Sequence, residues 1–127
     1  MSIRSGQPDE RPADRESLVC WNKDMQAQAL RVEAEGQIFI FPFTHLVFAV
    51  LNSSSSAEEL RVSLTTHEIR IHGRNLREIA LALQKLAVDW IRPIPSRFAT
   101  LAEKGASVIE KIDVTDLQSD ASRNEAE

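Results

Sequence analysis

Apolar and polar residues alternate along residues 60–64 and again along residues 68–72. A period of two is typical of β-strands that bury one face. A tight turn between the two stretches pairs Val62 with Ile69 and keeps the apolar side chains on one side, whereas a register slipped by one residue would turn charges inward. The pattern therefore predicts a β-hairpin with a fixed register.

After Asn75 the apolar period becomes helical. The apolar residues that fall on one side of a helical wheel are Leu76, Ile79, Ala80, Leu83, Leu86, Ala87, Trp90 and Ile91. Asn75 suits the N-cap position, Glu78 completes a capping box, and Pro93 marks the end. These signals predict one long amphipathic helix that covers a sheet.

A second hairpin is predicted nearer the N-terminus. Residues 30–35 alternate before a Glu-Gly turn, which pairs Val32 with Phe39. The phenylalanines of this region then line the core. The same register points Ile38 and Ile40 away from the core.

Four further segments complete the expected elements. Residues 46–51 are apolar on both faces and favour a strand in the middle of the sheet. Residues 18–25 fit either a short helix or a docked segment. Residues 97–104 favour a short helix, and residues 107–114 favour a closing strand.

Together these elements predict an α+β domain, in which an antiparallel sheet of about five to six strands is packed on one face by a long amphipathic helix. Residues 17–114 form this single domain. Residues 1–16 are polar and mixed in charge, and residues 115–127 are acidic. Both terminal segments are predicted to be disordered tails.

The net charge of −4 is concentrated in the predicted tails. Residues 17–114 hold eleven basic and eleven acidic residues. A neutral domain has no bulk electrostatic preference for nucleic acid or for an anionic membrane. Nucleic acid and membrane are therefore not the expected partners.

Several features favour a cytoplasmic location. Residues 38–51 are apolar but shorter than the roughly 20 residues of a membrane helix. Residues 1–16 lack the apolar stretch of a secretory signal. The single cysteine, Cys20, cannot form an internal disulfide, which fits a reducing compartment.

Two apolar pairs are expected to face solvent. Leu81 and Val88 lie on the side of the predicted helix that is otherwise polar, and Ile38 and Ile40 form the second pair. Exposed apolar pairs are typical of subunit contacts. The alternative is that the terminal segments fold over them. We therefore predict a homodimer, or a contact with another protein, through these four residues.

A basic cluster is the second candidate site. In the predicted register Arg61 lies opposite Arg70, while Arg74 and Arg77 lie near the helix start, where backbone N–H groups favour anions. Neighbouring glutamates make an ordinary salt-bridged surface the competing interpretation. The cluster supplies the alternative function, a domain that binds a small ligand, an anion or nucleic acid.

No catalytic, cofactor-binding or metal-binding residue is predicted. His45, His67 and His72 lack the spacing of a metal site, and neither Cys20 nor the serine run 53–56 belongs to a known nucleophile motif. The sequence therefore predicts a non-enzymatic protein-interaction or assembly module that acts as a homo-oligomer.

Overall fold

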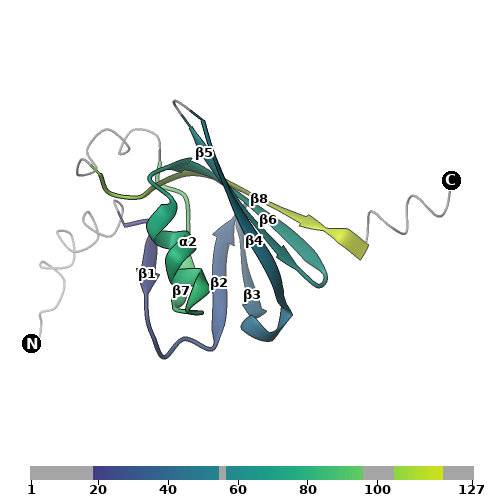
Figure 1. The fold of residues 1–127 in the computed structure, drawn as a ribbon. Coiled ribbons are helices and arrows are strands. Elements are labelled where there is room, and N and C mark those ends of the chain that lie inside the picture. Colours follow the sequence, from purple (N-terminus) through teal and green to yellow (C-terminus); the bar gives the residue numbers. More distant parts are fainter. Residues whose placement is uncertain (1–18, 55–56, 96–104, 119–127) are drawn as a thin grey trace, which may run out of the picture.

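The computed structural model describes residues 19–54, 57–95 and 105–118. These residues form two four-stranded β-sheets and a short α-helix, so the protein is mostly β (Figure 1). In chain order the elements are β1 (Trp21–Lys23), β2 (Ala29–Ala34), β3 (Gln37–Pro42), the 3-10 helix η2 (Phe43–His45), β4 (Leu46–Ser53), β5 (Glu58–Leu64), β6 (His67–Arg74), α2 (Arg77–Gln84), β7 (Val88–Ile91) and β8 (Val108–Asp116). The predicted α+β fold, with one sheet beneath a long helix, is wrong.

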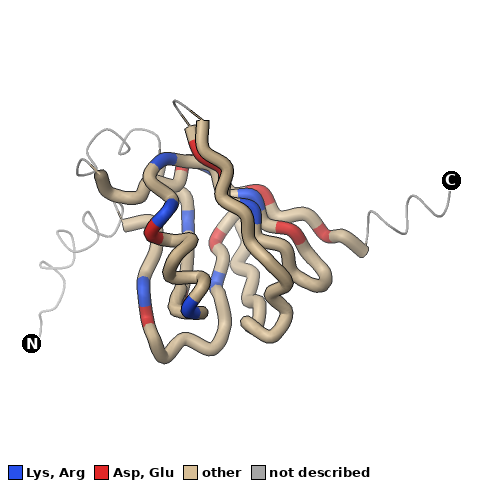
Figure 2. Tube along the Cα trace, viewed as in Figure 1, with Lys and Arg blue, Asp and Glu red and all other residues tan. Residues whose placement is uncertain are grey.

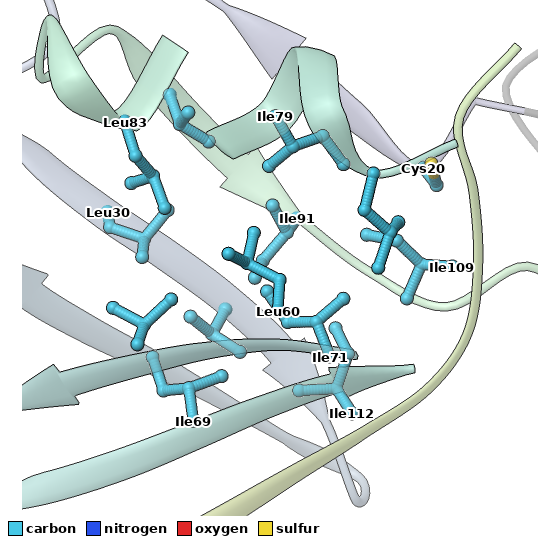
Figure 3. Packing of buried hydrophobic residues seen from close by; sticks show 14 of the residues in the cluster. Cys20, Leu30, Leu60, Ile69, Ile71, Ile79, Leu83, Ile91, Ile109 and Ile112 are labelled. Atoms are coloured by element: carbon cyan, nitrogen blue, oxygen red, sulfur yellow. The ribbon is translucent and has the colours of Figure 1, made fainter. Parts of the chain in front are cut away.

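The first sheet has the strand order β1-β7-β2-β3, and the second sheet has the order β4-β5-β6-β8. Strands β2 and β7 run parallel, whereas the other neighbouring strands are antiparallel. The inner faces of the sheets and α2 contribute to one apolar core. In Figure 3, Leu83 and Ile79 of α2 lie above Leu30 and Ile91 of the first sheet, and Leu60 and Ile71 of the second sheet lie below.

Both predicted hairpins are confirmed. Strands β5 and β6 pair Val62 with Ile69, and strands β2 and β3 pair Val32 with Phe39. Val62, Ile69 and Val32 are fully buried. The alternating pattern therefore sets the register, because any slip by one residue would expose these side chains.

The predicted closing strand is β8, and it continues to Asp116. The ladder between β6 and β8 shifts by one residue at Glu110, opposite His72 and Gly73. Gly73 lies so close to β8 that a Cβ atom there would overlap the carbonyl oxygen of Val108. Only glycine fits at this bulge.

The structure describes some of the remaining predicted segments and not others. Within residues 18–25, for which the sequence allows a short helix or a docked segment, residues 21–23 form strand β1. The predicted tail 1–16, residues 119–127 of the predicted acidic tail, and the predicted helix 97–104 lie outside the described residues.

The predicted long helix is wrong in its second half. Helix α2 ends at Gln84, and the chain reverses at Leu86, which has a left-handed φ of 54°. Residues 88–91 then form β7. Valine, tryptophan and isoleucine favour strands, and their spacing here also suits a helix. The apolar period alone therefore does not separate the two structures.

The predicted capping box is also wrong. Asn75 has a left-handed φ of 55°, and Leu76 occupies the N-cap position without a side-chain cap. Instead, a carboxylate oxygen of Glu58 in β5 accepts a hydrogen bond from the backbone N–H of Leu76 at 2.7 Å. This negative charge lies at the positive end of the helix dipole. A long-range contact therefore replaces the local cap.

Strand β4 contains residues 46–51, which were predicted to lie in the middle of the sheet. That prediction is wrong, because β4 is an edge strand of the second sheet. Its apolar side chains are not covered on both faces, and Val47 and Phe48 are exposed to solvent. A run of apolar residues therefore does not by itself indicate a central strand.

Leu86→Gly is expected to be more stable than Leu86→Ala by about 0.5–1 kcal/mol. Both substitutions remove the same exposed side chain, but only glycine adopts the left-handed φ without steric cost. Equilibrium unfolding in guanidinium chloride measures the difference. Equal stabilities would show that residue 86 does not hold this backbone conformation.

Glu58→Ala is expected to destabilise the fold by about 1–2 kcal/mol, because it leaves the Leu76 N–H without its acceptor. Glu58→Gln keeps an acceptor oxygen and is expected to cost less. Glu59→Ala, on the outer face of the same strand, is the matched control. Thermal unfolding of the three variants gives the order, and an equal loss in Glu58→Ala and Glu59→Ala would contradict the assignment.

Candidate protein-interaction surface

Four strands form the edges of the two sheets, namely β1, β3, β4 and β8. A free edge exposes unpaired backbone groups, and proteins protect it with short strands, charges, proline or bulges. Strand β1 has three residues including Lys23, β3 ends in Pro42, and β8 has four charged residues and the bulge at Glu110. Strand β4 has eight residues with neither a charge nor a proline. Its own bulge, at Val47, lies near its start, so the rest of β4 is the least protected of these edges.

Strand β4 departs from regular pairing only near its start. Leu46 pairs with Leu64, and Phe48 pairs with Ser63, so Val47 is an extra residue. The pairing with β5 then runs without interruption to the end of β4. A straight, regular segment of edge is thus available beyond the bulge.

The side chains of β4 are exposed on both faces. Phe48 and Val50 lie on the outer face, because Val50 is opposite the outward-facing Arg61. Ala49 lies on the inner face, because it is opposite the buried Val62. Val47 is 57% and Phe48 50% exposed, and Ala49 is also exposed. In Figure 2 the trace of β4, the front strand, is tan, since it has no charged residue.

The outer face of the first sheet carries the predicted pair Ile38 and Ile40. Both are exposed as expected, at 64% and 67%. Ile40 is opposite Arg31, which is opposite Trp90. The Trp90 ring centroid lies 5.8 Å from the guanidinium carbon of Arg31 and 4.9 Å from that of Arg92, within cation–π range. Trp90, predicted to face the core, is therefore on the outer face.

The prediction that Leu81 and Val88 are exposed together on one side of a helix is wrong. Val88 is fully buried in β7, because the chain leaves the helix before reaching it. Leu81 is exposed on α2 and lines a hollow of about 450 Å³ with Trp21 and Ala82. Val88 cannot contribute to a subunit contact, and Leu81 remains a single exposed leucine of the ordinary kind.

The predicted arginine cluster lies on a salt-bridged face. Arg61 is opposite Arg70 as predicted. Arg70 donates a hydrogen bond to Glu68 at 2.9 Å, and this bond raises the pKa of Arg70 above its usual value.

The other two arginines lie nearer α2. Arg74 lies 3.5 Å from a carboxylate oxygen of Glu110, and Arg77 begins α2. Two of the four guanidinium groups therefore have carboxylate partners, as is usual on protein surfaces.

The histidines have local roles. His72 lies 3.3 Å from a carboxylate oxygen of Asp113 on the outer face, and His67 packs against Phe41 at the edge of the core, with 5.2 Å between ring centroids. Within residues 19–54, 57–95 and 105–118, no group of three or more His, Cys, Asp or Glu side chains is placed to hold a metal ion. The same residues contain no helix long and apolar enough to cross a membrane.

Cys20 is a buried thiol between the two sheets. Its side chain is 2% exposed, and its Sγ donates a hydrogen bond to the carbonyl oxygen of Ser107 at 3.2 Å. Burial disfavours the thiolate and raises the pKa of Cys20 from 9.0 to about 11, although backbone hydrogen bonds and the charge of Arg92 oppose this effect. The thiol is therefore inert at neutral pH.

Sequence reasoning missed Val47 and Phe48 as surface residues. The signal was present, because residues 46–53 contain no charge, but an uncharged run fits a covered central strand equally well. Only the strand order places this run at an edge. The exposed residues then become a candidate contact for another protein.

The stability that Cys20 adds is expected to fall as the pH rises from about 9 to 11. The unfolded chain releases the thiol proton near pH 9.0, whereas the folded chain holds it up to about 11, so alkaline pH favours unfolding. The difference in unfolding free energy between wild type and Cys20→Ala should shrink by about 2 kcal/mol between pH 8 and pH 10.5. A difference that does not vary with pH would contradict the raised pKa.

Comparison with known proteins finds no match to this chain among family models, curated proteins or solved structures.

Proposed function

We propose that this protein is a non-enzymatic assembly module that works as a homo-oligomer. The observation that carries the proposal is the exposed and uncharged edge strand β4. Such an edge offers backbone donors and acceptors together with apolar side chains. A further β-strand is the natural ligand for that combination.

The composition of the outer face supports this interpretation. The residues that lie in line with Val50 across the second sheet are Arg61, Arg70 and Asp113. In this row of the outer face, every strand except β4 therefore carries a charged residue. Since an outward position makes no contribution to the core, folding alone does not require Phe48 and Val50 to be apolar. Burial against another protein gives a reason for them.

The exposed isoleucines of β3 form the alternative surface through which two copies could bind each other. Ile38 and Ile40 are as exposed as Val47 and Phe48, but their strand ends in Pro42, which lacks a backbone donor. The outer face of the first sheet would bind a partner through side chains alone. Matched substitutions on the two strands therefore distinguish the surfaces.

Sedimentation equilibrium of the full chain is expected to show reversible dimers. Phe48→Lys with Val50→Lys should weaken self-association at least tenfold, which corresponds to about 1.4 kcal/mol, because it puts four positive charges into one contact. Circular dichroism should be unchanged, because both side chains point away from the core.

Ile38→Lys with Ile40→Lys is the matched control and is expected to leave self-association intact. Dissociation by the isoleucine variant alone would move the contact to the first sheet. A wild-type chain that stays monomeric at its highest soluble concentration would overturn the proposal.

A further inference from the structure

We infer that two copies of this chain join through their β4 strands, antiparallel to each other, with a twofold axis that passes at Ala49. The two second sheets then form one continuous sheet of eight strands. This inference rests on the proposed homo-oligomer and adds the identity of the joining strands, their direction and their register.

A second copy is the occupant that the edges of the described residues favour. A strand that adds to β4 must itself have a free, regular and uncharged edge. Among β1, β3, β4 and β8, only β4 meets that requirement, as the short β1, the proline of β3 and the charges of β8 show. Pairing β4 with β4 also uses both unprotected edges at once. The assembly therefore closes as a dimer and does not grow into a filament.

The twofold axis fixes the direction and limits the register. Two identical strands related by an axis perpendicular to the sheet are antiparallel, and their inner and outer faces must coincide. Phe48, Val50 and Asn52 lie on the outer face, whereas Ala49 and Leu51 lie on the inner face. Each residue of one copy therefore lies opposite a residue of the other copy that points to the same face, so the two residue numbers are both even or both odd. The axis must pass through a residue and not between two residues.

Among the registers that remain, the one centred at Ala49 places apolar residues opposite each other along residues 47–51. In this register, Phe48 of each copy lies opposite Val50 of the other copy, and the two Ala49 residues lie opposite each other. Aromatic residues opposite β-branched residues are favourable pairs in antiparallel sheets. Centring at Val50 would instead place Phe48 opposite Asn52, and centring at Leu51 would place Ala49 opposite Ser53. Centring at Phe48 would place Val47, the extra residue of the bulge, next to the axis and opposite Ala49. Among these registers, only the one at Ala49 keeps Phe48, Ala49 and Val50 opposite apolar residues within the regular part of β4.

Charge permits this pairing. Strand β4 has no charged residue, so no like charges meet across the new ladder. The nearest charged side chain in the central row is Arg61, which lies one strand away beside Val50. Each Val50 is then flanked by Arg61 of its own chain and Phe48 of the other copy. The new apolar strip lies in the middle of a charged sheet face.

Cysteine crosslinking tests the register. Residues directly opposite in an antiparallel pair have Cα atoms about 4.5–5.5 Å apart, within the range of a disulfide. Diagonal neighbours are about 7–8 Å apart and lie outside it. Ala49→Cys should therefore form a disulfide-linked dimer under a mild oxidant that accepts the two thiol electrons. Val50→Cys, whose nearest copy of itself is diagonal, should crosslink at least tenfold more slowly.

The chain provides its own controls for this experiment. Cys20 is buried and contributes no background, which the wild-type chain verifies. Ile40→Cys, on the exposed face of β3, reports random collisions between copies. Sedimentation equilibrium of each variant under reducing conditions shows whether its self-association matches that of wild type.

The outcomes separate this inference from the proposed function. Rapid crosslinking of Ala49→Cys alone supports the register. Rapid crosslinking of Val50→Cys in its place, or of neither variant while wild type still dimerises, overturns the inference and leaves the homo-oligomer standing. A wild type that is monomeric, with all three variants at the collision rate, overturns both.

Discussion

The insertion of β7 between β1 and β2 is the contact on which the first sheet depends. Strand β7 pairs with β1 on one side and with β2 on the other. At the two ends of this pairing, the backbone N–H of Asp24 donates to the carbonyl of Ala87 at 2.8 Å, and that of Arg92 donates to Cys20 at 2.9 Å. Without β7, the three-residue β1 would have no neighbour in its sheet. The left-handed turn at Leu86 is what allows the chain to leave α2 and reach this position.

This dependence explains which parts of the fold the sequence predicts. A hairpin register follows from local alternation, so the pairs Val62–Ile69 and Val32–Phe39 are predictable. The end of α2 is different, because no glycine or proline marks it and residues 86–91 fit both periods. The gain that selects the strand comes from burying Val88 and Ile91 against distant parts of the chain. Sequence periodicity does not record such a gain.

The same distinction applies to the candidate surface. The exposure of Ile38 and Ile40 follows from the hairpin register and is predictable. The burial of Val88 and the exposure of Phe48 are not, because each depends on where a strand lies in its sheet. A strand's place in the sheet order is a property of the whole topology. The exposure of a residue is therefore predictable where it depends on the register of one hairpin, but not where it depends on the order of strands in the whole sheet.

Topology also explains why β4 is an edge strand. Strand β3 is the edge of the first sheet, and only the three residues of η2 separate it from β4. Short connections join neighbouring positions, so β4 starts at the adjacent edge of the second sheet. The edge position of β4 is thus set by the fold, but its apolar outer side chains are not. Phe48 and Val50 lie on the outer face, so packing of the core does not require them to be apolar.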